Sequence, residues 1–355
     1  MDKILTIVIP TYNMEKFLRR CLDSLIISDK TLFEKLEVLV VNDGSKDSSS
    51  KIAHEYEDKY PNVFRVIDKE NGNYGSCVNR GLKESKGKYI KILDADDSYK
   101  RDCLYEYLLK LQDSDADLII NDCDILSVSG GKIDEFSYSL PKNQSDKIII
   151  PLTIQMHCVA YKTNNLREIN YTQTEGISYT DQEWIFMPMT TVNSIYYIKV
   201  PLYDYYVGRE GQTMDPNVYL RNFWQEITII KRMLSQFYSA EISFGKAKQY
   251  MYEKIEDRIR TLFKNVLVIA GCCQSNDLIE FDKFLSSEYP HFYNDVVMNI
   301  HLSRQIPFRF IKYWCNNGYQ IPKNHPILIV FRYKNIYRKV CNLLSFSAIK
   351  SLIHK

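Results

Sequence analysis

The chain has 355 residues, with 46 Lys and Arg against 44 Asp and Glu and a formal net charge of +2. It is 45% hydrophobic and 25% charged, the balance of an ordinary globular protein, which excludes long disorder, collagen and coiled coil. No apolar run reaches the roughly 18 residues that a bilayer-spanning helix needs, and no signal peptide is predicted. The nine cysteines include no CxxC pair, so we expect reduced thiols and no structural zinc site.

Four apolar runs divide the first hundred residues, at 4–9, 38–41, 63–67 and 89–93, of which the third includes one Arg and the fourth one Lys. Continuous rather than alternating runs predict strands that are buried on both faces of a parallel sheet. Apolar residues at helical spacing lie between them, around 17–25, 52–56 and 77–82. Strand–helix alternation predicts an α/β fold, a βαβ array whose ligands bind at the carboxyl ends of the strands.

The pattern loosens after about residue 115. Strands are expected at 118–126 and 195–200, with polar loops between them. From 217 onward the sequence becomes helical, with apolar residues three and four apart over 219–237 and 250–270. We therefore expect a domain over 1–213, made of a first half 1–115 and a second half 116–213, followed by a mainly helical region over 214–355.

Acidic residues follow the predicted strands at the points where the strands end. Asp43 follows the second strand, and Asp94, Asp96 and Asp97 follow the fourth. Parallel strands deliver these carboxylates to one edge of the sheet, and carboxylate oxygens without His or Cys suit Mg²⁺ or Mn²⁺. In an extended backbone Asp94 and Asp96 would face the same way, so both could address one cation. The alternative role for Asp97 is to cap the helix that starts near Arg101.

Three segments carry these residues, and together they resemble a known family. Residues 6–13 (TIVIPTYN), 40–45 (VVNDGS) and 92–97 (ILDADD) are similar to the opening motifs of the family 2 glycosyltransferases. The resemblance implies the GT-A fold, a Rossmann-like and mainly parallel sheet, and an inverting enzyme that uses nucleotide-sugar donors. The family's Arg-Asn-x-Gly reads here as Val78, Asn79, Arg80 and Gly81, so the role of its Arg has no counterpart.

The resemblance also implies site residues. Asp96 would be the direct ligand of a divalent cation, Mn²⁺ or Mg²⁺, and Asp94 would lie near the metal and the ribose. Contacts with the nucleotide sugar would come from Pro10, Thr11, Tyr12, Asn13, Asp43, Asn79, Asp94, Ala95 and Arg209. Arg209 would reach the diphosphate, because a guanidinium suits phosphate, and its alternative role is that of a surface residue in a loop.

An inverting transfer also needs a base for the acceptor hydroxyl. The family places it some 80–90 residues after the metal-binding Asp, and Asp181 lies 85 positions after Asp96. Glu183 is the second candidate for the base and for acceptor contacts. Trp184 would stack on an acceptor sugar or anchor its helix as a buried residue. His157 is expected in the pocket wall or the core.

The function so predicted is transfer of a sugar from UDP-hexose or UDP-N-acetylhexosamine to a hydroxyl of a glycan or lipid-linked oligosaccharide, in cell-surface polysaccharide synthesis of the capsule or exopolysaccharide type. A polyprenyl-phosphate glycosyltransferase shares the early motifs and stays an alternative. A nucleotidyltransferase would show a Gly-rich basic loop, which residues 9–15 lack. A non-catalytic sugar-nucleotide-binding module should have lost Asp96 or Asp181, and both are present.

The last 55 residues, 301–355, carry ten Lys and Arg and no Asp or Glu. Residues 1–300 hold the other 36 basic and all 44 acidic residues, a net charge of −8. Basic residues interleaved with aromatic ones favour an anionic membrane surface, with packing on the acidic body as the alternative and no nucleic-acid partner expected. We therefore expect a cytoplasmic protein that binds the inner face of the cell membrane peripherally.

Overall fold

The structure is a computed structural model that describes residues 2–138, 150–208, 216–322 and 324–331. The chain forms two compact units, one made of Met1–Asp215 with Lys231–Lys254 and the other of Pro216–Ile230 with Ile255–Lys355. Among the helices of these described ranges, none combines the length and apolar content that crossing a bilayer requires. The domain boundary expected after residue 213 stays a prediction.

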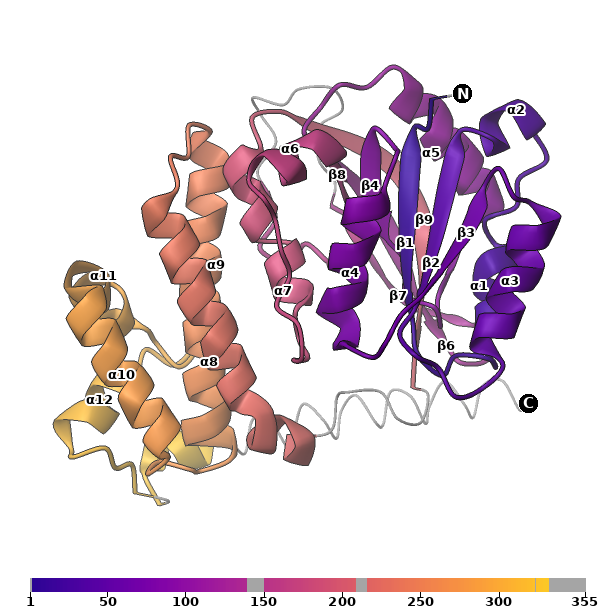
Figure 1. Cartoon of the computed structure of the whole chain (residues 1–355). Helices are drawn as coiled ribbons and strands as arrows, with labels where there is room; N and C mark the ends of the chain where they lie inside the picture. Colours follow the sequence, from indigo (N-terminus) through magenta and orange to yellow (C-terminus); the bar gives the residue numbers. More distant parts are fainter. Residues whose placement is uncertain (1, 139–149, 209–215, 323, 332–355) are drawn as a thin grey trace, which may run out of the picture. The chain divides into compact units, whose positions relative to one another are not determined.

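The first unit is built on one sheet. Its strands are β1 (Leu5–Thr11), β2 (Leu36–Asn42), β3 (Phe64–Asp68), β4 (Tyr89–Ile92), β5 (Ser98–Tyr99), β6 (Leu118–Ser127), β7 (Lys132–Phe136), β8 (Val159–Lys162) and β9 (Ile195–Val207). Within the described part of the chain they form a nine-stranded sheet in the order β3-β2-β1-β4-β8-β6-β9-β5, with β7 paired to β6 (Figure 1). The four predicted apolar runs are the parallel strands β1 to β4, as expected.

The second half of the sheet differs from the first in strand direction. Strand β8 pairs antiparallel with both β4 and β6, and β5 pairs antiparallel with β9. The predicted strands at 118–126 and 195–200 are β6 and β9, which run parallel to each other. The fold is therefore α/β, with a parallel first half of the sheet and a mixed second half, in agreement with the predicted class.

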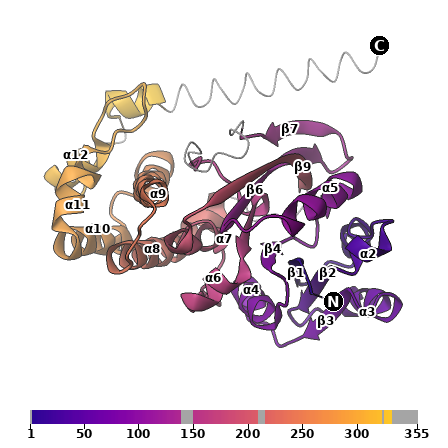
Figure 2. The same cartoon turned by 90° about the horizontal axis from the view of Figure 1, so that it is seen from above.

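Helices cover both faces of the sheet. The first unit contains α1 (Leu18–Asp23), α2 (Lys30–Phe33), α3 (Ser49–Lys59), α4 (Asn73–Glu84), α5 (Arg101–Gln112), α6 (Thr163–Glu168) and α7 (Asp181–Trp184). Helices α4 and α5 lie on opposite faces of the parallel strands (Figures 1 and 2). Short 3₁₀ turns at Met156–Cys158 and Met187–Thr191 complete the connections.

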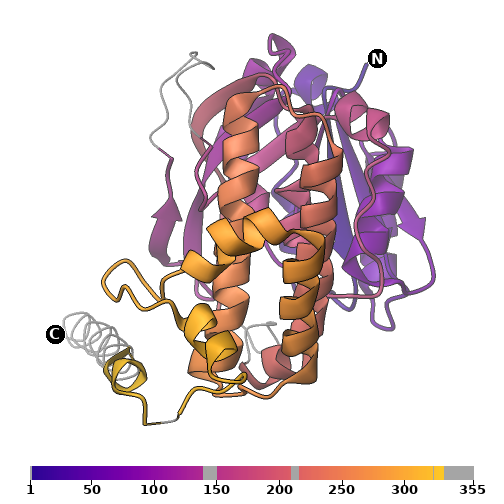
Figure 3. The ribbon, with the colours of Figure 1, turned by 90° about the vertical axis from the view of Figure 1, so that its left-hand side faces the viewer.

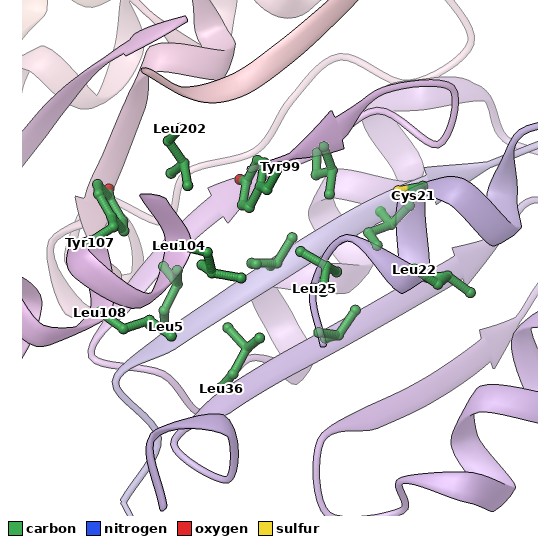
Figure 4. Close-up of a cluster of buried hydrophobic side chains, with 14 of the residues drawn as sticks. Leu5, Cys21, Leu22, Leu25, Leu36, Tyr99, Leu104, Tyr107, Leu108 and Leu202 are labelled. Atoms are coloured by element: carbon green, nitrogen blue, oxygen red, sulfur yellow. The ribbon is translucent and has the colours of Figure 1, made fainter. Parts of the chain in front are cut away.

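The alternation of side chains along β1 explains the two faces. Leu5, Ile7 and Ile9 pack into a cluster with buried residues of α1, α3 and α5, part of which Figure 4 shows. Val8 points to the other face, where α4 approaches so closely that a Cβ built on Gly81 would lie 2.4 Å from Val8 Cγ1. Because successive residues of a strand face opposite ways, β1 contributes to both layers of the core.

The C-terminal part is mainly helical. Its helices are α8 (Pro216–Ser239), α9 (Gly245–Phe263), α10 (Asn276–Glu288), α11 (Pro290–Asp295) and α12 (Phe310–Asn316), with a 3₁₀ turn at Val297–Asn299. Figure 3 draws α8 and α9 beside each other, in agreement with the predicted helical patterns. The second predicted helix, 250–270, ends as a π-helical turn over Lys264–Ile269, which allows the consecutive Val266, Leu267 and Val268 all to be buried.

Candidate active site

A pocket of about 350 Å³ opens at the carboxyl ends of β1, β2 and β4. It is lined by Pro10, Thr11, Tyr12, Met14, Asp43, Asn71, Asn73, Tyr74, Cys77, Asp94, Ala95, Asp96 and Tyr205. Seven of the residues predicted from the motifs belong to this lining, namely Pro10, Thr11, Tyr12, Asp43, Asp94, Ala95 and Asp96. The parallel register, with Thr11 opposite Asn42, brings these strand ends together.

Asp43 is held in place by neighbours from the end of β3. Its Oδ1 accepts a hydrogen bond from Lys69 Nζ at 2.5 Å and one from the Gly72 backbone N–H at 2.9 Å. Lys69 directly follows β3, so the rule that located Asp43 at a strand end also applies to Lys69, which the sequence reasoning missed. The ion pair orients the Asp43 carboxylate at the pocket wall, with the carboxylate and ammonium side chains 4% and 19% exposed.

The segment that carries Asp94 and Asp96 is a turn and not an extended strand. The Asp97 backbone N–H donates to the Asp94 carbonyl at 3.0 Å, and Arg20 Nη2 donates to the Asp96 carbonyl. The expectation that both carboxylates face one way because of an extended backbone was therefore wrong. The turn nonetheless leaves both residues in the pocket lining, because it begins directly after β4 ends.

Tyr74 joins this turn to α4 and was also missed from the sequence. Its hydroxyl donates to Asp94 Oδ1 at 2.8 Å. Burial raises the pKa of the Tyr74 hydroxyl, and the Asp94 and Asp181 carboxylates raise it further. Tyr74 therefore stays a neutral donor that fixes one oxygen of Asp94.

Asp97 has a structural role that differs from helix capping. Its two carboxylate oxygens accept from Tyr203 Oη at 2.6 Å and from the Tyr206 backbone N–H at 2.8 Å. Helix α5 has Lys100 as its N-cap and no side-chain cap. Burial, with Asp94 and Asp96 nearby, raises the pKa of the Asp97 carboxyl group. Asp97 thus ties the turn to β9 from the buried side.

The donor set fits a divalent cation that also has non-protein ligands. Within the described ranges, no group of three or more His, Cys, Asp or Glu side chains is arranged to enclose a metal ion. Asp94 and Asp96 supply two carboxylates to an open pocket, and Mg²⁺ is commonly held by one or two carboxylates together with substrate phosphates and water. Burial raises the pKa of Cys77 to about 12, so the one thiol in the lining stays protonated and is a poor ligand.

Asp181 lies near the pocket although it is not part of the lining. It is the first residue of α7, half-buried, and its Oδ2 accepts from Gln182 Nε2 at 2.7 Å. Its charge contributes to the raised pKa of both Tyr74 and Tyr205, which line the pocket. Tyr179, two residues earlier, has a φ of 63°, a conformation that a bulky residue rarely adopts and that is commoner at functional sites.

Glu183 and Trp184 have roles in the core and not in acceptor contacts. The Glu183 side chain is 0% exposed, and its oxygens accept from Thr174 N, Thr174 Oγ1 and Arg232 Nη1, each at 2.6 Å. Trp184 is also 0% exposed and packs edge-on against Tyr161 and Tyr171. The geometry therefore contradicts the acceptor-binding role proposed for both, because neither reaches the pocket surface.

Two other predicted residues, Asn13 and Asn79, do not line the pocket. Asn13 is exposed, and its Oδ1 accepts from the Lys46 backbone N–H at 2.8 Å. Asn79 uses its amide to hold Gln173 and Glu175, so it positions a loop and is not in the pocket lining. Arg209 lies outside the described residues. His157 is buried between the rings of Tyr203 and Tyr205, at centroid distances of 4.7 and 4.8 Å, in the layer behind the pocket wall.

The fold is that of the GT-A class of glycosyltransferases. Residues 6–165 match the sequence model described as Glycosyl transferase family 2. The N-terminal part of the chain, which carries all three motifs, thus matches the family 2 glycosyltransferases, as the motifs predicted.

Two relatives and one solved structure give the extent of the similarity. EpsH of Bacillus subtilis is 29% identical over 210 residues, which cover 56% of this chain and 60% of EpsH. The minor teichoic acid biosynthesis protein GgaB of the same organism is 27% identical, over 69% of this chain and 28% of GgaB. The crystal structure of S. aureus TarS 1–349 with UDP-GlcNAc has a TM-score of 0.64 at 17% identity and covers 88% of this chain and 87% of that one. This chain thus spans less than two thirds of the length of these two curated relatives. The similarity to TarS supports the fold.

Proposed function

We propose that the protein transfers a sugar from a nucleoside diphosphate donor to a hydroxyl group with inversion at the anomeric carbon. The observation that carries this proposal is that Asp43, Asp94 and Asp96 line one pocket. The charge of Asp181 also raises the pKa of Tyr74 and Tyr205, two tyrosines of the same lining. A UDP-hexose or UDP-N-acetylhexosamine is the proposed donor, which the UDP-GlcNAc bound to the similarly folded TarS supports.

The donor half of the mechanism uses the strand ends. Tyr12, 46% exposed in the pocket lining, presents its ring to the nucleobase, and Asp43 accepts hydrogen bonds from the uracil or ribose. Asp94 and Asp96 would hold a divalent cation, which when bound neutralises the diphosphate leaving group. Tyr74 and Arg20 keep the turn that carries these two carboxylates in one conformation.

The acceptor half depends on Asp181. Its carboxylate takes the proton from the acceptor hydroxyl while that oxygen attacks the anomeric carbon opposite the diphosphate. General-base assistance of this kind contributes about 10²–10⁴-fold to the rate. The buried Glu183 and its partners Thr174 and Arg232 hold the helix on which Asp181 lies.

We propose a glycan or lipid-linked oligosaccharide as the acceptor, in synthesis of a cell-surface polysaccharide. The teichoic acid function in the name of GgaB supports this acceptor class. Such an acceptor is met at the cytoplasmic face of the membrane, and the excess of Lys and Arg in 301–355 would favour an anionic surface there.

A donor screen tests the transferase proposal. The full-length protein is incubated with Mn²⁺ and a panel of nucleotide sugars, and released nucleoside diphosphate is measured. We expect one or two UDP-sugars to be hydrolysed slowly and Asp96→Asn to abolish the release. Release from no donor, or equal release by Asp96→Asn, would contradict the assignment of this pocket.

A further inference from the structure

A basic surface lies in the C-terminal unit, on and next to α12. This helix buries Phe310, Ile311 and Trp314, and Trp314 Nε1 donates to the Cys273 carbonyl at 2.9 Å. Arg309, Lys312, Tyr313 and Asn316 follow the spacing i, i+3, i+4, i+7 and therefore share the opposite face. The helix is fixed by its apolar side, so its polar side is a rigid surface.

A hollow of about 490 Å³ lies along this polar face. Its lining includes His301, Phe308, Arg309, Lys312, Tyr313 and Asn316. The ring of Phe308 packs against Tyr313 at 5.4 Å and stacks on His325 at 4.9 Å, which makes one wall aromatic. The volume is within the range of about 300–1,000 Å³ that small-molecule sites occupy.

The lining of the hollow contains two cations, Arg309 and Lys312, and no acidic residue. Residues 301–331 contain no Asp or Glu. Arg309 and Lys312 are exposed, and among the residues that the structure describes neither forms an ion pair. By contrast, Arg258 and Arg260 on α9 form ion pairs with Glu226 and Glu256. The α12 face thus combines an unpaired guanidinium and ammonium with an aromatic wall.

We propose that this hollow binds a phosphate ester. A phosphate group offers three strong acceptor oxygens, which a forked guanidinium, a point-like ammonium and the Asn316 amide can address together. The aromatic wall would contact the organic part of the ester. The phosphate would come from a lipid headgroup or from a soluble phosphorylated compound. The inference rests on α12 alone and does not depend on the proposed transferase activity.

The test compares two double variants of the full-length protein. Arg309→Gln with Lys312→Gln removes the two cations of the hollow. Lys283→Gln with Arg304→Gln removes the same charge from exposed positions of the same unit that are not in the lining. Binding is measured by titrating glycerol phosphate into each variant and following the NMR spectrum of the protein. Because all four replaced side chains are exposed, circular dichroism should show that every variant folds like the unaltered protein. We expect the first pair to weaken binding at least about tenfold and the control pair by less than about twofold.

The second arm distinguishes the two sources of phosphate. Flotation with phosphatidylglycerol vesicles, against phosphatidylcholine vesicles, measures attachment to a lipid headgroup. Capture by phosphatidylglycerol vesicles that glycerol phosphate reverses would support a headgroup in the hollow. Titration by glycerol phosphate without vesicle capture would support a soluble ester. Binding of neither probe, or equal loss in both double variants, would overturn the proposal. Release of nucleoside diphosphate from the donor should be the same in all variants, so this test and the donor screen can fail independently.

Discussion

Asp181 and Glu183 are only two positions apart, but we expect their replacement to have different effects. Replacing Asp181 should lower turnover, and replacing Glu183 should lower the stability of the fold. Asp181→Asn removes the proton acceptor and keeps the shape of the side chain. We expect turnover to fall by at least about 10²-fold while the affinity for UDP stays near that of the unaltered protein. Glu183→Gln should leave turnover per folded molecule nearly unchanged, because Glu183 is 0% exposed and not in the pocket lining.

The magnitude for Glu183 follows from its three hydrogen bonds. In Glu183→Gln, an amide N–H₂ replaces one oxygen and meets donors, either the Thr174 N–H or the Arg232 guanidinium. A buried donor left without an acceptor costs about 1–3 kcal/mol, so the melting temperature should fall by several degrees. The assays are released UDP under saturating donor, UDP titration, and thermal unfolding by circular dichroism. Normal turnover in Asp181→Asn together with an inactive but fully stable Glu183→Gln would refute this reasoning.

Three further predictions concern the metal, the core and the tail. Removing divalent cations with EDTA should abolish transfer, and Mn²⁺ should restore it. Asp96→Asn should weaken Mn²⁺ binding in the presence of UDP at least tenfold, as measured by electron paramagnetic resonance. Asp97→Asn should mainly lower the free energy of unfolding, by about 1–3 kcal/mol, because it loses a buried acceptor. Gly81→Ala should lower the free energy of unfolding in urea by about 1–3 kcal/mol, since the added Cβ would meet Val8. The control Gly245→Ala, whose Cβ would have no atom within 4 Å, should leave stability unchanged or raise it. Equal effects of the two changes would contradict the close packing of α4 on β1. Deleting 332–355, which lies outside the described residues and carries six of the ten basic residues of 301–355, should weaken co-sedimentation with anionic liposomes in a salt-dependent way; unchanged binding would place the membrane contact elsewhere.

The amino-acid sequence is enough to predict the first half of the fold and the edge of the sheet at which the pocket opens. Mostly apolar runs identified β1 to β4, because strands that are covered on both faces show no regular alternation of apolar and polar residues. Their parallel arrangement then placed Asp43, Asp94 and Asp96 at one edge, where all three line the pocket. These features are local, or follow from the βαβ rule, so no long-range contact had to be known.

Tertiary structure decided the roles of residues that lie close together in sequence. Neighbouring acids take different roles, since Asp96 lines the pocket while Asp97 turns inward to Tyr203, and Asp181 lies near the pocket while Glu183 is buried against Arg232. The partners lie 106 and 49 positions away in the chain, so no local pattern could reveal them. The environment of a carboxylate is fixed by packing between distant segments, and this is why the sequence located the site while the fold assigned its residues.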